Sequence, residues 1–320
     1  MNVLITGGAG YIGSTVAWYF IDKGHKVTII DNLKNGNLLN IPRKANFIKS
    51  DINNINKLKK LLNVHYDVVL HFAGLKNNIE SFKKKKKYIY NNFNKSKKFI
   101  ELCISKGINN FIFSSTAAVY GSKQKKIKED MKLKPISPYA ISKFKLENFF
   151  LEKKKINYVI LRYFNVAGVE KKLRCGFSNK NDNSLFYNLC ISYLNDKIFN
   201  IFGNNLKTVD GTPIRDFIYV SDLAKIHYFF SKQIDKNNYR LILNCGYGWG
   251  TSVLEVVNTF NKIFIKKVNY KFLKKRDGDI NYSVADNSKL LKLFNFKYNK
   301  ITKIKIMIKT SVNWIKKLNR

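Results

Sequence analysis

Short runs of β-branched and aromatic residues alternate with longer amphipathic stretches through the first half of the chain. The short runs are typical of buried strands: VLIT (3–6), VTII (27–30), FIK (47–49), DVVLHF (67–72), FIFSS (111–115) and YVILRYF (158–164). Between them, apolar residues recur about every 3.6 residues, as in helices, over 11–22, 88–106 and 139–153. This alternation predicts an α/β fold, built on a Rossmann-type, doubly wound parallel sheet.

The second half has a less regular pattern, which indicates a different kind of domain. Loops are expected around 171–183 and 203–216, and helices near 184–195, near 252–265 and from about 301. We therefore expect a first domain over 1–165 and a smaller, mixed α/β C-terminal domain over 166–320. The segment 217–245 regains helix and strand character, so we expect it to return to the first domain.

Charge is the most unusual feature of the composition. The 320 residues include 59 Lys and Arg against 21 Asp and Glu, a net charge of +38. Such an excess suggests a nucleic acid or an anionic membrane as partner. However, only seven of the basic residues are Arg, and the lysines are spread over nearly every polar segment. Even the densest run, Lys83 to Lys87, is better explained as a solvated face, so we expect no nucleic-acid partner.

Cysteine spacing and the N-terminal sequence indicate the compartment. The four cysteines lie far apart without a CxxC pair, so we expect buried thiols and no metal site. The start, MNVLITGGAGYIG, lacks the pattern of a signal peptide, and no run is long and apolar enough to span a membrane. A cytoplasmic protein with no membrane partner is expected.

A glycine-rich turn directly follows the first predicted strand. In TGGAGYIG, Gly7, Gly10 and Gly13 precede an amphipathic helix, as in loops that bind the pyrophosphate of a dinucleotide. The second strand ends at Asp31, about twenty residues further on, where a carboxylate binds the adenosine ribose. Because a carboxylate there repels the 2′-phosphate of NADP, we infer NAD as the cofactor.

Other strand ends of the first domain supply further candidates for the cofactor site. Asp51 and Ile52 follow the third strand. Phe72, Ala73, Gly74 and Lys76 follow the fourth, at the edge where such sheets bind ligands. The full set of cofactor-binding candidates is Gly7, Gly10, Tyr11, Ile12, Gly13, Asp31, Asn32, Asp51, Ile52, Phe72, Ala73, Gly74, Lys76, Asn91, Ser114, Tyr139, Lys143 and Phe164.

Candidate catalytic residues follow the fifth strand. This strand runs into Ser114, Ser115 and Thr116, and the next helix carries Tyr139 and Lys143 four residues apart, on one face. A tyrosine is a poor base unless nearby positive charges stabilise its phenolate, and we expect the lysine ammonium and the nicotinamide to do so. The order of these motifs favours hydride-transfer chemistry over a surface tyrosine beside a solvated lysine.

A series of motifs runs in order along essentially the whole chain: TGGAGYIGS, DNLKNG, DI, HFAGLK, FSSTAAVYG, SPYAISK, LRYFNVAG, IFGNN, DGTPIRDFIYVSDLA and RDGD. In these motifs the chain resembles the UDP-glucose 4-epimerases, within the NAD-dependent epimerase/dehydratase family of extended short-chain dehydrogenases. This resemblance implies an isomerase that interconverts UDP-galactose and UDP-glucose. Hydride would pass from sugar carbon 4 to tightly bound NAD and return to the opposite face.

The resemblance also implies residue roles. Tyr139 would remove the proton of the 4-hydroxyl, Lys143 would hold the nicotinamide ribose, and Thr116 would hydrogen-bond the 4-hydroxyl. The first domain would bind NAD and the second the UDP-sugar. The implied substrate-binding residues are Thr116, Tyr139, Asn165, Ser184, Leu185, Arg215, Arg276, Asp279 and Ser283. The family also implies a homodimer formed by helices 88–106 and 139–153; alternatively, the extra apolar residues of these helices pack only inward.

Several departures from the family pattern leave the substrate open. Thr15, Val166 and Ser184 stand where His, Pro and Asn are usual, and 170–182 is poorly matched. Ser283 stands where some relatives carry a bulky tyrosine, so UDP-N-acetylglucosamine is an alternative substrate. UDP-glucuronate remains another. A 4,6-dehydratase is disfavoured because Thr116 is followed by two alanines, which transfer no protons. A non-catalytic NAD- or nucleic-acid-associated protein is a remote alternative.

Overall fold

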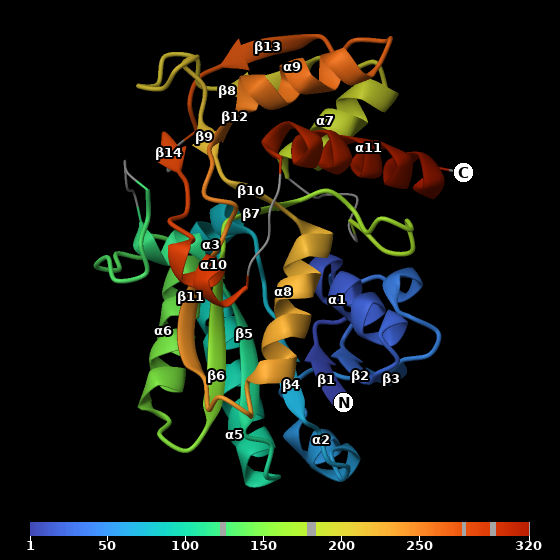
Figure 1. Cartoon of the computed structure of the whole chain (residues 1–320), viewed down its shortest axis with the longest axis vertical. Coiled ribbons are helices and arrows are strands. Elements are labelled where there is room, and N and C mark those ends of the chain that lie inside the picture. Colours follow the sequence, from blue (N-terminus) through green and yellow to red (C-terminus); the bar gives the residue numbers. More distant parts are fainter. Residues whose placement is uncertain (122–125, 178–183, 277–279, 295–298, 320) are drawn as a thin grey trace. The chain divides into compact units, whose positions relative to one another are not determined.

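A computed structural model describes residues 1–121, 126–177, 184–276, 280–294 and 299–319. The chain divides into two compact units (Figure 1). Unit 1 comprises Met1–Gly121, Lys132–Tyr163 and Leu223–Leu243, and unit 2 comprises Ser122–Met131, Phe164–Asp222 and Asn244–Arg320. The described residues 126–131 thus group with unit 2, although their place in the sequence suggested the first domain.

Unit 1 is built on a seven-stranded sheet in the order β11-β6-β5-β4-β1-β2-β3. Neighbouring strands from β1 to β6 pair in parallel, so their carboxyl ends meet at one edge. The strands are β1 (Asn2–Thr6), β2 (Lys26–Asp31), β3 (Asn46–Lys49), β4 (Val68–His71), β5 (Asn110–Thr116), β6 (Asn157–Tyr163) and β11 (Arg240–Cys245). This order reverses between β1 and β4, which confirms the predicted doubly wound fold.

Helices cover both faces of this sheet (Figure 1). On one face, Tyr19 and Phe20 of α1 pack edge-on against Tyr228 of α8. The other face is covered by α2, α5 and α6. The helical elements are α1 (Tyr11–Asp22), η1 (Leu38–Asn40), α2 (Ile55–Leu61), α3 (Asn78–Lys83), α4 (Lys85–Ile89), the π-helix η2 (Tyr90–Asn94), α5 (Lys95–Ser105), η3 (Ala117–Tyr120), α6 (Pro138–Glu152) and α8 (Val220–Gln233).

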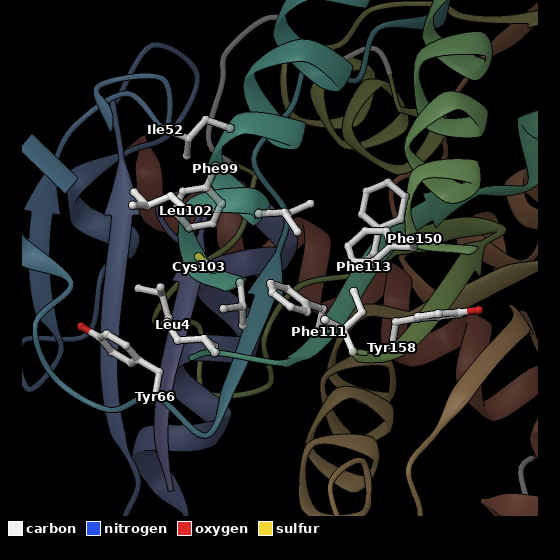
Figure 2. Packing of buried hydrophobic residues seen from close by; sticks show 14 of the residues in the cluster. Leu4, Ile52, Tyr66, Phe99, Leu102, Cys103, Phe111, Phe113, Phe150 and Tyr158 are labelled. Carbon is white, nitrogen blue, oxygen red and sulfur yellow. The ribbon is translucent and has the colours of Figure 1, made fainter. Parts of the chain in front are cut away.

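The core between the sheet and helices α2, α5 and α6 is rich in aromatic rings (Figure 2). Phe150 of α6 packs on Phe111 and Phe113 of β5, with ring centroids 5.8 and 5.5 Å apart. Burial of such side chains stabilises the fold by about 1.5–3 kcal/mol each. Since this core lies directly beneath the end of β5, it fixes the position of α6 against that strand.

The apolar residues of the two helices expected to form a dimer are buried to different degrees. Tyr88, Phe99 and Phe150 are fully buried and Phe149 is 5% exposed, so these rings pack inward within the chain. Ile89, Phe93 and Phe144 are only partly buried, and the expected dimer through these helices stays a prediction.

Unit 2 carries three small sheets, in the orders β10-β7, β12-β9-β14 and β13-β8. Its strands are β7 (Asn165–Ala167), β8 (Phe199–Phe202), β9 (Ile214–Arg215), β10 (Phe217–Tyr219), β12 (Thr251–Ser252), β13 (Tyr270–Leu273) and β14 (Tyr282–Ser283). Its helices are α7 (Leu185–Leu194), α9 (Val253–Ile263), α10 (Ser288–Leu293) and α11 (Lys300–Leu318). The mixed α/β character predicted for this region is confirmed. Across the described residues, no helix is long and apolar enough to cross a membrane.

Candidate functional site

The glycine turn of unit 1 brings the backbone close to the start of α1. Gly7 has φ +72°, and its C=O accepts a hydrogen bond from the Gly10 N–H (3.1 Å). A Cβ at Gly7 would lie 2.7 Å from the Ala73 nitrogen, and one at Gly13 only 2.4 Å from the Gly7 oxygen. Gly10 caps α1 without a side-chain hydrogen bond. The first-turn N–H groups therefore lack a side-chain cap, as in helix ends that bind phosphate.

Asp31 closes the next strand beside this turn. It is 9% exposed and accepts hydrogen bonds from the N–H groups of Ala9 (3.0 Å) and Leu33 (2.8 Å). Burial raises its pKa, while these two hydrogen bonds lower it. The carboxylate is thus tied to the glycine turn, and its spare lone pairs suit the hydroxyls of a ribose.

Asp51, at the end of β3, is engaged by neighbouring side chains. Its Oδ2 accepts hydrogen bonds from Lys95 Nζ (2.9 Å) and Asn32 Nδ2 (3.0 Å). Burial alone would raise the pKa of Asp51, but the hydrogen bonds, led by that from Lys95, hold it below its usual value. Ile52 beside it is 7% exposed. The sequence did not indicate Lys95 as the partner of Asp51.

The end of β4 is held by a buried polar network. His71 shares hydrogen bonds with Thr6 (2.7 Å) and Ser96 (2.9 Å). Asn92, in the π-helix η2, accepts from the Leu75 N–H (2.7 Å) and donates to the Leu75 C=O (2.9 Å). A Cβ at Gly74 would lie 3.3 Å from Asn92 Oδ1 and 3.7 Å from Lys143 Nζ. The segment after β4 therefore reaches the predicted catalytic lysine.

Tyr139 and Lys143 lie in the first two turns of α6. Ser137 caps this helix by accepting the Ala140 N–H (3.1 Å). Lys143 Nζ donates to the Ser114 C=O (2.8 Å) and lies 4.9 Å from the centre of the Phe113 ring. Tyr139 shares a hydrogen bond with Thr116 at the end of β5. The structure thus brings Ser114, Thr116, Tyr139 and Lys143 together.

Burial acts on both ionisable groups of this pair. It lowers the pKa of Lys143 to about 8, against the charge of Glu147, which raises it. It raises the pKa of Tyr139, while the Thr116 hydrogen bond lowers it. The Lys143 ammonium donates to the Ser114 C=O, and its expected stabilisation of the Tyr139 phenolate, together with the nicotinamide, stays a prediction.

A buried ion pair supports this site, and sequence reasoning missed it. Glu147 and Arg162 are 1% and 2% exposed, with Arg162 Nη2 2.7 Å from Glu147 Oε2. Glu147 also accepts a hydrogen bond from Ser115, and Arg162 donates to the Tyr120 hydroxyl (2.7 Å). The network joins β5, β6 and α6 just below Lys143. A Glu four residues after Lys143 was the one available hint.

All but one of the cofactor-binding candidates lie in unit 1, in segments that follow its parallel strands or on helices beside them. The exception is Phe164, which belongs to unit 2, is 6% exposed and donates its N–H to the Cys245 C=O (3.0 Å). A glycine turn that side chains would fill, with a carboxylate beside it, fits a dinucleotide such as NAD. Among the described residues, no group of three or more His, Cys, Asp or Glu is arranged to hold a metal ion.

Unit 2 holds most of the predicted substrate-binding residues. In its three-stranded sheet, Arg215 pairs with Thr251 of β12 on one side and with Ser283 of β14 on the other. Asn165, exposed on β7, pairs with Phe217 of β10. The Arg276 guanidinium lies 4.6 Å from the centre of the Phe202 ring. Ser184 and Leu185 form the start of α7, and Asp279 lies outside the described residues.

The fold and the Tyr139–Lys143 pair define the class: an extended short-chain dehydrogenase with a dinucleotide half and a second, mixed α/β half. Residues 3–246 match the model of the NAD dependent epimerase/dehydratase family. A UDP-glucose 4-epimerase of Azospirillum brasilense is 35% identical, over 100% of this chain and 93% of that protein.

Solved structures agree with this relationship. A UDP-glucose-4-epimerase from Stenotrophomonas maltophila, with bound NAD and formylated UDP-arabinopyranose, matches with a TM-score of 0.95 at 30% identity, over 100% of this chain and 99% of that one. The UDP-Glc/GlcNAc 4-epimerase from Campylobacter jejuni matches with a TM-score of 0.83 at 33% identity, over 99% of each chain. The chain belongs to the NAD dependent epimerase/dehydratase family.

Proposed function

We propose that this enzyme interconverts UDP-galactose and UDP-glucose by epimerisation at carbon 4 of the sugar. The observation that carries the proposal is the arrangement at the end of β5, where Tyr139 hydrogen-bonds Thr116 and Lys143 is anchored by the Ser114 C=O. It is supported by similarity to UDP-glucose 4-epimerases along the full length of the chain.

Each residue of this arrangement has a proposed task. Tyr139 accepts the proton of the sugar 4-hydroxyl, while Thr116 hydrogen-bonds that hydroxyl and keeps the phenol oriented. Bound NAD supplies a hydride acceptor for carbon 4. Lys143 holds the nicotinamide ribose, and its charge stabilises the phenolate that Tyr139 forms once a positive cofactor adds to the local field. Burial excludes water, which strengthens these interactions.

The remaining residues bind rather than react. The glycine turn at Gly7 to Gly13 holds the NAD pyrophosphate and Asp31 its ribose. Arg215 and Arg276 hold the UDP diphosphate, since a guanidinium offers a planar fork of donors that matches phosphate oxygens. Asn165 contributes an amide to the same ligand.

Conversion of UDP-galactose without added cofactor tests this proposal. Purified protein is incubated with UDP-galactose, and UDP-glucose is measured by ion-exchange chromatography. We expect product from the wild type and a loss of about 100-fold or more in Tyr139→Phe, which lacks the proton acceptor. Tyr270→Phe, on an exposed strand position of unit 2, is the matched control and should keep full activity. A wild type without turnover, or an active Tyr139→Phe enzyme, would contradict the proposal.

A specific observation favours UDP-N-acetylglucosamine as a second substrate. Ser283 is small, 7% exposed and in register with Arg215 of the proposed diphosphate site. Replacing it by a large side chain would fill space that an acetamido group needs. We expect Ser283→Tyr to lose turnover of UDP-N-acetylglucosamine and keep that of UDP-galactose. No wild-type turnover of the acetylated sugar would eliminate this second substrate.

We also propose a homodimer in the cytoplasm. Exposed apolar side chains remain on the helices expected to pair, with Tyr90 49% and Leu151 50% exposed. Light scattering of the purified protein measures the oligomeric state, and a monomer at micromolar concentration would contradict it. Fractionation of cells tests the compartment.

A further inference from the structure

One buried carboxylate in unit 2 lies at the junction of the segments that carry predicted substrate-binding residues. Asp216 follows Arg215 at the end of β9 and is fully buried. Its backbone joins two neighbours: its C=O accepts the Asn165 N–H (2.9 Å), and its N–H donates to the Ser283 C=O (2.9 Å). Three of the residues proposed to bind the UDP-sugar are therefore at or beside this position.

Three backbone N–H groups of the described residues donate to the side chain of Asp216. Its Oδ1 accepts from Tyr247 (2.8 Å), and its Oδ2 accepts from Gly248 (2.9 Å) and Ala285 (3.2 Å). The first two groups belong to the turn 246–248 that precedes β12, and the third follows β14. One carboxylate thus joins both strands that flank β9.

The surrounding backbone is shaped to admit this carboxylate. A Cβ at Gly246 would lie 2.4 Å from Asp216 Oδ2 and 2.7 Å from its carboxyl carbon. Any larger residue at 246 would displace the acid or the turn. Such a tight fit is needed because each N–H would otherwise be buried without an acceptor.

We propose that Asp216 is a positioning residue for the UDP-sugar site. Its carboxylate holds the turn 246–248 and the end of β14 against β9, and so fixes the positions of Arg215 and Ser283. The inference rests on the proposed function for its ligand. A carboxylate is required because only an acceptor without protons can serve all three donors.

The charge of this group is sensitive to pH. Burial raises the pKa of Asp216 to about 6, although its three backbone hydrogen bonds and the charge of Lys126 lower it. Other charged or titratable groups nearby are Arg215, the adjacent residue, and Tyr247, whose hydroxyl donates to Asp222 (2.5 Å). Lys303 Nζ pairs with the same oxygen, Asp222 Oδ2 (2.5 Å).

The direction of the pH effect follows from this protonation. As the pH falls through about 6, Asp216 gains a proton and loses acceptor capacity. Its hydrogen bonds to the three N–H groups then weaken, and we expect substrate binding to weaken with them. Burial lowers the pKa of His71 to about 3 and that of His227 to about 4, and all four histidines, His25, His65, His71 and His227, belong to unit 1. UDP-glucose is a diphosphate diester whose charge stays constant in this range.

Calorimetric titration of the NAD-loaded protein with UDP-glucose, from roughly pH 5 to pH 8, tests the inference. We expect wild-type affinity to fall as the pH drops through about 6. Asp216→Asn should bind roughly ten-fold or more weakly at neutral pH, because its amide opposes one of the N–H donors, and should show no such transition. Its KM for UDP-galactose should rise while kcat stays within about three-fold, since Tyr139 and Lys143 are untouched.

Two further variants keep the test decisive. Asp286→Asn is the control, one residue beyond Ala285, and should behave as the wild type. The pKa of Asp286 is lowered, chiefly by hydrogen bonds from Ser288. Gly246→Ala keeps the carboxylate but displaces it or the turn, and should weaken UDP-glucose binding even if Asp216→Asn fails to fold. Circular dichroism and NAD content verify folding.

The results distinguish failure of the inference about Asp216 from failure of the proposed function. Normal wild-type binding and turnover, with UDP-glucose affinity unchanged in a folded Asp216→Asn or Gly246→Ala protein, would overturn the inference alone. A pH transition that persists in Asp216→Asn would also overturn it. A wild type that neither binds UDP-glucose nor converts UDP-galactose would overturn the inference together with the proposed function.

Discussion

Substitution Glu147→Gln should produce a large loss of stability from a single side chain of unit 1. Glu147 and Arg162 are 1% and 2% exposed and are joined by a 2.7 Å contact. Gln keeps the size and one acceptor oxygen, but leaves the Arg162 charge buried without a counter-charge. Breaking a buried pair in this way costs about 3–5 kcal/mol, a substantial part of a total stability of about 5–15 kcal/mol.

The expected change in melting temperature follows from this free energy. At about 2 °C per kcal/mol, which suits a chain of this size, the midpoint should fall by about 6–10 °C. The substitution should also move the alkaline limb of the kcat/KM profile to lower pH. The reason is that Glu147 raises the pKa of Lys143, so its removal lowers that pKa further below about 8.

Calorimetry and a pH–rate profile measure the two effects. Glu152→Gln, at the exposed end of the same helix, is the matched control and should change stability by less than about 0.5 kcal/mol. A double variant, Glu147→Leu with Arg162→Met, should recover much of the stability, since neither charge of the pair remains, yet keep the shifted pH profile. Loss of less than about 1 kcal/mol in Glu147→Gln, with the pH profile unmoved, would refute the reasoning.

Three further predictions follow from the site and the charge. Gly13→Ala should lose bound NAD, because its Cβ would lie 2.4 Å from the Gly7 oxygen; absorbance of the released cofactor measures the loss. Gly10→Ala, whose Cβ would lie 3.2 Å from the same oxygen, should lose less NAD, and equal retention by both variants would contradict this. Thr116→Val should move the acidic limb of kcat/KM to higher pH, because the Thr116 hydrogen bond lowers the pKa of Tyr139; an unmoved limb would count against it. The melting temperature should rise with moderate salt, because a net charge of +38 repels itself, and a flat or falling dependence would argue otherwise.

The sequence by itself determined the fold class and the order of the chemical groups. Strand and helix differ in the period of their apolar residues, so alternation of the two periods predicts a parallel sheet without knowledge of contacts. The glycine turn and Asp31 follow the first two strands at the spacing of a dinucleotide site. Tyr139 and Lys143 share one helix face because four residues make about one turn.

Only the tertiary structure decided which partners these groups meet. Glu147 and Arg162 lie on separate elements, and no local pattern links them. Lys143 donates to the Ser114 C=O, because β5 and α6 pack around Phe113 and Phe150 and so bring the lysine to the end of that strand. Likewise, burial raises the pKa of Tyr139, and the burial of this side chain depends on the whole fold.

Asp216 shows the same division between sequence and structure. In the sequence it is one acid in a motif, next to the more conspicuous Arg215. Its importance comes from three N–H groups, those of Tyr247, Gly248 and Ala285, that lie up to 69 residues away along the chain. Periodicity and spacing describe neighbours along the chain, whereas burial and hydrogen bonding depend on segments that meet only after folding.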